Sequence, residues 1–528
     1  MTSKDQGVAL ERESPALRAK VRIPPDDRHN QLLVDRVHPP DWENPTPPGR
    51  YDLVVLGGGS GGLVSAAIAA GVGGRVALVE RHLLGGDCLN TGCVPSKALI
   101  RAGRAWAEAR RGAERFGAPA VSGDGDFATV MERMRRIRAE IGQHDAAERF
   151  RNLGIDVYLG DGRFIGEDRL EVGGQVMEFR RAVVATGGRP AVPPVQGLEE
   201  SGYLTSETVF GLTERPEELV VLGGGPIGCE LAQAMAQLGS TVTLLEMQDR
   251  ILPQDDPDAA EIVARALAAD GVDVRPGTRV VSVDAQGGKH GVRVHRESPA
   301  GEEADATETL TSDRILVAAG RAPNVEGLGL EDAGVAFDST GVRVDERLRT
   351  TNKRIFAVGD VTGKAQFTHL ADAHARLAVP NALFFGRGKT GGLVVPRATY
   401  TSPEVAHVGL APHATPDGPD KVDTITIPFE DVDRARLDGD SEGFLRVHLK
   451  RGTDRIEGAT VVGAHAGELL APLVVAMRGR VGLGALSGAI FPYPTVGEAV
   501  RKAGDQWRRR KLTPRVKSIM ARLLRLLR

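Results

Sequence analysis

This 528-residue chain has few cysteines, no long apolar run and almost no net charge. Its 3 cysteines are too few for a secreted scaffold held together by disulfides. No apolar run approaches the roughly 18–20 residues that a membrane-spanning helix needs, and the N-terminus lacks the apolar core of a signal peptide. The net charge of −3 gives no reason to expect a nucleic-acid partner. We therefore predict a cytoplasmic protein that binds no nucleic acid.

Aromatic residues are also scarce, whereas glycine is abundant. Only 4% of the chain is aromatic, and 66 residues are glycine, a composition that suits α/β folds with many tight turns between strands and helices. The hydrophobic content of 41% and charged content of 26% are typical of a globular protein. Because the chain is too long for one ordinary domain, we expect two or three.

A complete strand–helix–strand unit begins at Tyr51. The apolar run YDLVVL leads into the turn GGGSGG, a helix of small residues, and a second strand that ends at Glu80. Gly57 allows the tight turn, Gly59 lets a pyrophosphate approach the backbone, and Gly62 lets helix and strand pack closely. The pyrophosphate would lie at the positive end of the helix, and Glu80 would accept hydrogen bonds from a ribose.

The same unit recurs after Leu219, with the turn GGGPIG and a second strand-terminal acid. The corresponding residues are Gly223, Gly225, Gly228 and Glu246. A single glycine fingerprint is weak evidence, but two complete copies with matched acids predict two nucleotide sites. The Glu246 carboxylate would bind a free ribose hydroxyl and repel a 2′-phosphate, which favours NADH over NADPH. Arg250, four residues on, could weaken that preference, so NADPH stays an alternative.

Two of the three cysteines, Cys88 and Cys93, lie in the segment GGDCLNTGCVPSK at 85–97. In an undistorted helix, positions five apart point about 140° away from each other, so we expect a distorted first turn around Cys88. The helix dipole and Lys97 would both favour a thiolate. An inert pair or half of a metal site is the alternative, but no other clustered cysteines exist to complete a zinc site. The segment predicts electron transfer from a bound cofactor into a Cys88–Cys93 disulfide. We interpret the third cysteine, Cys229, as a small buried hydrophobe.

Taken together, these motifs resemble those of the pyridine nucleotide–disulfide oxidoreductases. The resemblance covers about residues 50–505 and includes ATG at 185–187, GRAPN at 320–324 and the FAVGD that ends at Asp360. Within this family of flavoenzymes, the chain is most similar to mercuric reductase-like and dihydrolipoamide dehydrogenase-like proteins. The resemblance implies that FAD occupies the first unit and NADH the second. The implied cofactor contacts are Gly57, Gly59, Gly62, Glu80, Gly86, Lys97, Gly162, Gly187, Gly223, Gly225, Gly228, Glu246, Gly320 and Asp360.

The family fold is α/β, with two Rossmann-like dinucleotide-binding domains and a C-terminal α+β dimerisation domain, and it implies a homodimer. We expect six segments along the chain. These are an irregular N-terminal arm (1–48), the first part of the FAD-binding domain (49–197), the NAD(P)-binding domain (198–312), the second part of the FAD-binding domain (313–388), the dimerisation domain (389–506) and a basic tail (507–528).

The resemblance also assigns catalytic roles. Cys93 would lie beside the flavin, Cys88 would be the interchange thiol that meets the substrate, and Lys97 would pair with Glu230 near the flavin N5. Electrons would pass from NADH through FAD and the cysteine pair to a small thiol, a disulfide or a soft metal ion.

Two departures from the family concern the acceptor. Disulfide-reducing members carry a histidine that protonates the leaving thiolate, but this chain has Tyr493 there, and Glu498 has lost its expected partner. A phenol with a pKa of roughly 10 is a poor proton shuttle at neutral pH, which argues against efficient lipoamide or glutathione turnover. Mercuric reductases end in a vicinal cysteine pair, which is absent here, although a soft metal could still reach Cys88 and Cys93. We predict no resident metal site.

The tail is the third departure. Residues 508–528 contain nine Lys or Arg and no acid, and Thr513-Pro514 is a typical helix start. Apolar residues then recur on one face at Val516, Ile519, Met520, Leu523, Leu524 and Leu527. Such a helix, over 512–528, could lie on an anionic membrane or pack on the dimer.

Three alternative functions stay open from the sequence. They are a true dihydrolipoamide dehydrogenase, an NADH diaphorase or quinone reductase in which electrons leave directly from the flavin, and a membrane-docked redox sensor.

Overall fold

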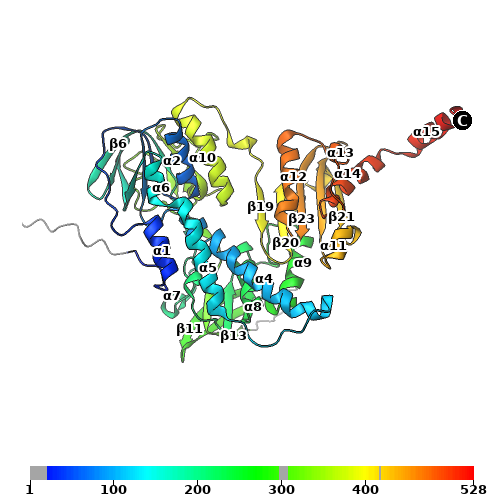
Figure 1. Cartoon of the computed structure of the whole chain (residues 1–528), viewed down its shortest axis with the longest axis horizontal. Coiled ribbons are helices and arrows are strands. Elements are labelled where there is room, and N and C mark those ends of the chain that lie inside the picture. Colours follow the sequence, from blue (N-terminus) through cyan, green and yellow to red (C-terminus); the bar gives the residue numbers. More distant parts are fainter. Residues whose placement is uncertain (1–20, 297–306, 415–417) are drawn as a thin grey trace, which may run out of the picture.

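The computed structural model describes residues 21–296, 307–414 and 418–528, which form three main sheets with their covering helices and three smaller sheets (Figure 1). The prediction that the N-terminus has no signal sequence falls on residues 1–20, outside the described part. Among the described residues, no helix has both the length and the apolar character needed to cross a membrane.

The first sheet has a parallel core in the order β3–β2–β1–β6–β18. Its strands are β1 (Tyr51–Leu56), β2 (Val76–Glu80), β3 (Ile155–Leu159), β6 (Gln175–Val184) and β18 (Ile355–Ala357), with β4 (Gly162–Gly166) and β5 (Arg169–Val172) added antiparallel. Helices α2 (Ser60–Gly71) and α10 (Thr368–Leu383) pack against each other beside it. The apolar strands are buried because both faces of a parallel sheet are covered. Since β18 comes late in the chain, this sheet is built from two separate stretches of sequence.

The second sheet is a smaller parallel unit in the order β10–β9–β8–β14. Its strands are β8 (Glu218–Leu222), β9 (Thr241–Leu245), β10 (Val272–Arg275) and β14 (Arg314–Val317), and helices α8 (Pro226–Gln237) and α9 (Pro257–Ala269) accompany them. An antiparallel layer of β11 (Thr278–Gln286), β12 (Lys289–Arg296) and β13 (Thr307–Ser312) follows. Each of the two predicted nucleotide units therefore begins its own parallel sheet.

The third sheet is antiparallel in the order β19–β20–β23–β22–β21. Its strands are β19 (Pro396–Thr399), β20 (Glu404–Gly409), β21 (Val422–Pro428), β22 (Phe444–Lys450) and β23 (Ile456–Gly463). Helices α12 (Ala466–Gly479) and α14 (Glu498–Arg510) pack on it and close a separate apolar core. Two Rossmann-like sheets followed by an antiparallel-sheet domain confirm the predicted fold class.

The N-terminal arm differs from the expectation of an irregular segment. Residues 28–37 form helix α1 (Arg28–Val37), whose first turn is capped by the Asp27 side chain through the amides of His29 and Asn30. Leu33, Val34 and Val37 are buried in the core of the first nucleotide unit. The abundance of Pro and Asp suggested coil, but one of those acids is the helix cap, and the apolar spacing of the short helix is enough to dock it.

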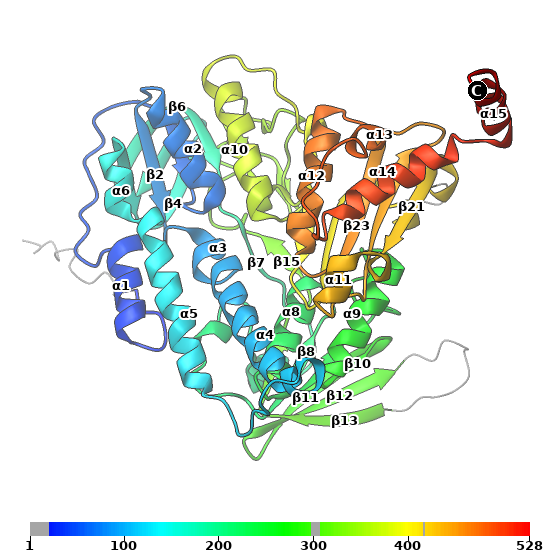
Figure 2. The ribbon, with the colours of Figure 1, turned by 45° about the vertical axis from the view of Figure 1, so that its right-hand side comes forward.

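Two long helices link α1 to the cysteine segment. Helix α4 (Cys93–Phe116) packs on α5 (Phe127–Ile141), and α5 packs on α1, so that the three helices stand side by side (Figure 2). Helix α4 also packs on α8 of the second nucleotide unit. The cysteine segment therefore lies between the N-terminal helix and both nucleotide units.

Candidate active site

Glycines form the turns between strand and helix in both nucleotide units. Gly57 has φ of +107°, and a Cβ atom there would lie 2.3 Å from the Ala185 carbonyl oxygen. A Cβ at Gly62 would lie 1.8 Å from the Gly57 oxygen, so only glycine allows the helix to approach this closely. Gly223 and Gly228 repeat both features, with φ of +109° and a distance of 1.9 Å, respectively. The two helix N-termini thus present open backbone to a ligand.

The two strand-terminal glutamates have matching partners. Glu80 accepts hydrogen bonds from the amides of Gly58 at 2.6 Å and His82 at 2.7 Å. Glu246 accepts them from Gly224 at 2.7 Å and Gln248 at 2.8 Å. Burial raises the pKa of Glu80 despite these bonds. Each carboxylate is therefore held next to its glycine turn, where a ribose of the bound nucleotide would reach it.

One cavity of about 2310 Å³ joins both nucleotide units and the cysteine pair. It is larger than the roughly 300–1,000 Å³ of an ordinary small-molecule pocket, as two dinucleotides side by side would require. Most of the predicted site residues line it: Gly57, Gly59, Glu80, Gly86, Cys88, Cys93, Lys97, Gly162, Gly187, Gly223, Gly225, Glu230, Glu246, Gly320 and Asp360. Gly62 and Gly228 lie beneath the turns instead, where they set helix packing.

The helix that carries the cysteines is broken between them. Cys88 lies in the short helix α3 (Gly86–Asn90), and Cys93 begins α4 after a break at Thr91 and Gly92. A Cβ at Gly92 would approach the Asp87 carbonyl oxygen to 2.8 Å, so this glycine permits the break. The predicted distortion is present, and it lets the two thiols, both reduced in this structure, interact with each other.

The two thiols have opposite proton affinities. The hydrogen bond from the Cys88 thiol lowers the pKa of Cys93 to about 5, aided by the Thr368 hydroxyl and the charge of Lys97, although burial acts in the other direction. The Cys93 sulfur lies 3.6 Å from the Thr368 oxygen. The pKa of Cys88 is raised well above the ordinary thiol value, by the same hydrogen bond and by burial. The reduced pair therefore holds one proton on Cys88 and a thiolate at Cys93.

Lys97 and Glu230 join α4 to α8 across the cavity. Lys97 Nζ lies 2.8 Å from Glu230 Oε2 and 4.5 Å from the centroid of the Tyr400 ring. The second Glu230 oxygen accepts a hydrogen bond from the Tyr400 amide at 2.8 Å. Burial would lower the pKa of Lys97, but the charge and the hydrogen bond of Glu230 outweigh it, so the pKa is raised. A fixed ammonium–carboxylate pair thus lies where the two nucleotide units meet.

Three further residues belong to this site although the sequence did not single them out. Thr368 contacts Cys93, Tyr400 covers Lys97, and Arg321 forms an ion pair with Asp87 and lies 3.7 Å from Asp360. Arg321 lies within the GRAPN motif, so the sequence pointed to its neighbourhood. Tyr400 lies in the segment ATYTSPEV at 398–405, which begins the C-terminal domain. Thr368 is separated from Cys93 by 275 residues, and only the fold brings the two together.

Tyr493 and Glu498 lie away from the cysteine pair of their own chain. The Tyr493 side chain is 71% exposed, and its hydroxyl donates to Asp433 at 3.1 Å. Glu498 begins α14 and accepts a hydrogen bond from Arg501 at 2.7 Å. Neither residue lines the cavity.

Cys229 is fully buried and donates to the Gly224 carbonyl at 3.2 Å, which confirms its interpretation as a small core residue.

Two nucleotide-type units that share a cavity with a reactive thiol pair define a dinucleotide-dependent thiol oxidoreductase. Residues 51–375 match the family described as pyridine nucleotide-disulphide oxidoreductase, and residues 395–504 match its dimerisation domain. The chain belongs to this family of flavoprotein enzymes, which implies FAD and a pyridine nucleotide as cofactors. The glycine cradles and the two carboxylates described above fit both.

Several curated proteins and solved structures are similar to the chain. It is 33% identical to a mercuric reductase from Staphylococcus aureus over 457 residues, which cover 86% of this chain and 82% of the relative. It is 35% identical to dihydrolipoyl dehydrogenase 3 from Pseudomonas aeruginosa over 459 residues, covering 86% and 97%. The Cu(II) complex of the HOCl-induced flavoprotein disulfide reductase RclA from Escherichia coli superposes with a TM-score of 0.76 at 29% identity, covering 87% and 99%. Relatives with different substrates match equally well, so the similarity establishes the class of enzyme and leaves the acceptor open.

Proposed function

We propose that this protein is an FAD-dependent, NADH-oxidising enzyme that reduces a thiol, disulfide or soft-metal acceptor through Cys88 and Cys93. The observation that carries this proposal is the pairing of a low-pKa Cys93 with a high-pKa Cys88, beside the Lys97–Glu230 ion pair in the cavity shared by both nucleotide units. The thiolate is the reactive form of cysteine, so a pair that holds one thiolate beside one thiol is typical of a reducing dithiol and not of two structural cysteines.

The residues divide the chemistry as follows. FAD, when bound, would supply the route by which two electrons from NADH reach the disulfide. The Cys88–Cys93 bond would break with uptake of these two electrons and one proton, leaving a thiol at Cys88 and a thiolate at Cys93. Lys97 would stabilise that thiolate, because its cation is fixed by Glu230. Thr368 would add a hydrogen bond to the same sulfur.

Transfer to a disulfide acceptor would need Cys88 to lose its proton. The Cys88 thiolate would attack one acceptor sulfur and release the other as a thiolate. The Cys93 thiolate would then displace the remaining acceptor sulfur from Cys88 and restore the Cys88–Cys93 bond. Because burial and the neighbouring thiolate hold the Cys88 proton tightly, this half of the cycle would depend on a proton acceptor.

We propose that the enzyme is a homodimer in which Tyr493 and Glu498 face the cysteine pair of the second subunit. The family's dimerisation domain at 395–504 contains both residues. Tyr493 is exposed and lies outside the cavity of its own chain, as a residue that serves another subunit would. The raised pKa of its hydroxyl, due to Asp433, makes it a weak proton shuttle at neutral pH. This favours an acceptor other than lipoamide.

Glu246 supports NADH as the preferred donor. Its carboxylate lines the cavity at the end of β9 and is fixed by two backbone amides. The Arg250 guanidinium donates to the Pro253 carbonyl at 2.8 Å and is thus engaged within its own loop. A 2′-phosphate would meet a carboxylate without that cation to offset the repulsion.

An acceptor panel tests the proposal. Purified enzyme with FAD and NADH is assayed on lipoamide, glutathione disulfide, a quinone, Hg²⁺ and Cu²⁺. We expect Cys88→Ser to abolish the acceptor activity and Cys229→Ser, the matched control at a buried cysteine, to retain it. Full activity of Cys88→Ser on every acceptor would overturn the proposal in favour of a diaphorase or quinone reductase. Efficient lipoamide turnover by the wild type would instead identify a dihydrolipoamide dehydrogenase.

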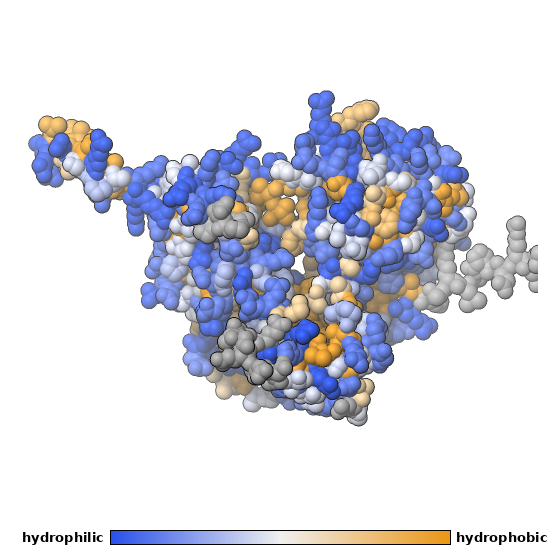
Figure 3. Space-filling view, turned by 180° about the vertical axis from the view of Figure 1, so that it is seen from behind, coloured by the Kyte–Doolittle hydropathy of each residue, from blue (hydrophilic) through white to orange (hydrophobic). Residues whose placement is uncertain are grey.

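The tail supports a second proposal, contact with an anionic membrane surface. Helix α15 (Pro514–Leu526) extends from the body, and its apolar side chains are exposed (Figures 1 and 3). Thr513 caps it by accepting a hydrogen bond from the Val516 amide. The exposed fractions of the apolar residues that share one face lie between 36% at Val516 and 76% at Leu527. A basic helix with a free apolar face fits a layer of anionic headgroups over acyl chains.

Vesicle binding tests this second proposal. We expect the full chain to sediment with phosphatidylserine-containing vesicles and the variant without residues 512–528 to remain in the supernatant. Vesicles of phosphatidylcholine alone, and Leu523→Asp in the full chain, serve as controls for charge and for the apolar face. If deletion leaves binding unchanged, or if it dissociates the dimer instead, the helix does not bind membrane. Redox-dependent vesicle binding without turnover on any acceptor would indicate a sensor. Without a membrane contact, the protein would be cytoplasmic.

A further inference from the structure

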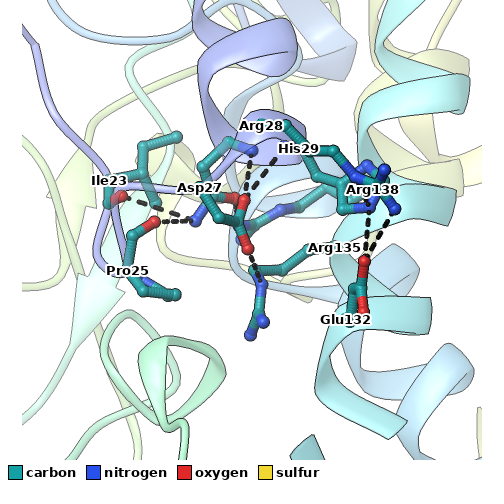
Figure 4. Close-up of polar contacts among 9 residues, drawn as sticks. Ile23, Pro25, Asp27, Arg28, His29, Glu132, Arg135 and Arg138 are labelled. Carbon is teal, nitrogen blue, oxygen red and sulfur yellow. Dashed lines mark hydrogen bonds and ion pairs between the residues drawn. The ribbon is translucent and has the colours of Figure 1, made fainter. Parts of the chain in front are cut away.

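The N-terminal segment, residues 21–42, precedes the family match, which begins at residue 51. It is nevertheless fixed to the body by polar contacts with α5. Figure 4 shows Asp27 at the start of α1 bonded to Arg135 of α5, and Arg28 and His29 directed at Glu132. The Asp27–Arg135 distance is 2.5 Å, and Arg28 lies 2.8 Å from Glu132. These contacts hold the N-terminal segment against α5.

One chain of hydrogen bonds continues from α1 to the cysteine segment. Asn30 Oδ1 accepts from Arg138 Nη2 at 2.6 Å, and Arg138 Nη1 donates to the Asn90 carbonyl at 2.7 Å. Asn30 and Arg138 are each 2% exposed, and Asn90 is 5% exposed. Asn90 is the last residue of α3, two positions after Cys88. A buried arginine thus links the N-terminal helix to the last residue of α3, the short helix that contains Cys88.

Arg138 needs both of these bonds. Burial lowers the pKa of its guanidinium to about 10, and repulsion from Arg135 adds to this effect. Among the described residues its Nε atom has no hydrogen-bond partner, so the oxygens of Asn30 and Asn90 carry most of the compensation for a buried cation. Loss of either oxygen would leave the guanidinium underbonded and free to shift.

Asn90 in turn holds the loop around Cys88. Its side-chain amide donates to the carbonyls of Leu84 at 3.1 Å and Gly86 at 2.9 Å, which bracket the start of α3. The Leu84 amide also bonds directly to the Val37 carbonyl of α1. A shift of Asn90 would therefore move the short helix that presents Cys88 to Cys93.

We propose that the N-terminal segment positions Cys88 for disulfide formation with Cys93, through the Asn30–Arg138–Asn90 contacts, and that Arg138 is a positioning residue. This inference rests on the proposed redox role of the cysteine pair. A disulfide forms only within a narrow range of Cα and Cβ separations. Freedom of α3 would lower the effective concentration of Cys88 at Cys93, and the disulfide would become easier to reduce.

Redox equilibration of two matched variants tests the proposal. Holoprotein with bound FAD is equilibrated anaerobically with mixtures of reduced and oxidised dithiothreitol, thiols are alkylated, and the Cys88–Cys93 peptide is measured by mass spectrometry. Asn30→Ala removes the acceptor for Arg138, whereas Gln31→Ala changes the exposed neighbour on the same helix, whose side chain donates to Asp26. We expect Asn30→Ala to shift the equilibrium toward the dithiol by about tenfold, equivalent to about 30 mV. Gln31→Ala should stay within about twofold of wild type.

The outcomes separate the two proposals. Equal equilibria for Asn30→Ala and Gln31→Ala would overturn the positioning role while leaving the redox pair intact. A wild-type protein with no reversible Cys88–Cys93 disulfide would overturn the proposed function, and the positioning role with it. If Asn30→Ala yields no folded holoprotein, Arg138→Lys replaces it, with Arg136→Lys on the exposed face of α5 as its control. Arg138→Lys keeps the charge but loses the fork that reaches both oxygens, so the same shift is expected.

Discussion

The region proposed to deliver electrons and the region proposed to receive the acceptor are built differently. Cys93, Lys97 and Glu230 lie on packed helices around the large cavity, and each side chain has at least one partner from another element. Tyr493, by contrast, is exposed and bonded only to Asp433 among the described residues. The first region has its chemistry fixed within one chain, whereas the second would require another subunit to complete it.

This contrast also appears in proton affinity. Around Cys93, the Cys88 thiol, the Thr368 hydroxyl and the Lys97 cation lower the pKa and favour the thiolate, whereas burial and the Glu230 carboxylate oppose it. Around Cys88, the hydrogen bond to Cys93 and burial raise the pKa and favour the protonated thiol, although the Thr368 hydroxyl acts in the other direction. Residues 491–498 contain no histidine that could take up its proton. From this comparison we expect contacts within one chain to support reduction of the proposed disulfide, and we expect acceptors to be selected at the proposed transfer out of it.

The largest effect is expected at Cys93. Cys93→Ser removes the sulfur that receives electrons, so turnover of disulfide and soft-metal acceptors should fall by roughly a thousandfold or more. Steady-state assays with NADH measure this loss.

In the wild-type reduced enzyme, the Cys93 thiolate should persist at neutral pH and become protonated only as the pH falls through about 5. A thiolate absorbance that titrates near the ordinary thiol value would contradict the geometry described for this pair.

A smaller loss is expected at the ion pair. Glu230→Gln leaves the largely enclosed Lys97 without its counter-charge, which should lower the pKa of Lys97 and disturb the contact between α4 and α8. We expect kcat/KM for NADH to fall by about tenfold to a hundredfold. Glu108→Gln, at an exposed acid of α4, is the matched control and should have no effect. A normal rate for Glu230→Gln would mean that the pair is only structural.

The nucleotide preference should change more modestly. Glu246→Gln retains an acceptor for the Gly224 amide but removes the charge that would oppose a 2′-phosphate. The ratio of kcat/KM for NADH to that for NADPH should drop by about tenfold, equivalent to about 1.4 kcal/mol. Comparison of the two coenzymes with the same acceptor measures it. An unchanged ratio would show that another residue sets the preference.

The smallest effect is expected at Tyr493. Tyr493→Phe removes one exposed hydrogen bond to Asp433. The equilibrium constant for unfolding and the turnover rate should each change by less than about twofold. Tyr493→His restores a group that titrates near neutral pH and should raise lipoamide turnover above the wild-type value. Equal lipoamide rates for the two variants would show that proton transfer at this position does not limit the acceptor step.

Local patterns predicted most of the site because they have strict geometric requirements. The glycine turns and the acids 23 residues after them predicted both nucleotide units. A Cβ atom at the first or last glycine of either turn would meet backbone at less than 3 Å. The five-residue spacing of the cysteines predicted the break between α3 and α4. Helix α1 was missed because the composition around it suggested coil, although Asp27 was available as a cap.

Contacts between distant parts of the chain were beyond prediction. Thr368 beside Cys93, Tyr400 over Lys97 and Arg138 between Asn30 and Asn90 depend on how α10, β19 and α5 pack, and no local periodicity records that packing. The sequence did indicate that Tyr493 replaces a histidine. The family resemblance also implied that this position serves the other subunit across the dimer interface, and Tyr493 does not line the cavity of its own chain.

The most direct test of the electron-delivery claim is to map thiols before and after anaerobic reduction by NADH. The oxidised holoenzyme is treated with iodoacetamide, a second sample is treated after one equivalent of NADH, and modified peptides are identified by mass spectrometry. We predict that Cys88 and Cys93 are protected before NADH and alkylated after it, with Cys229 unreactive in both samples of folded protein. Protection of Cys88 and Cys93 that does not change on addition of NADH would contradict the account.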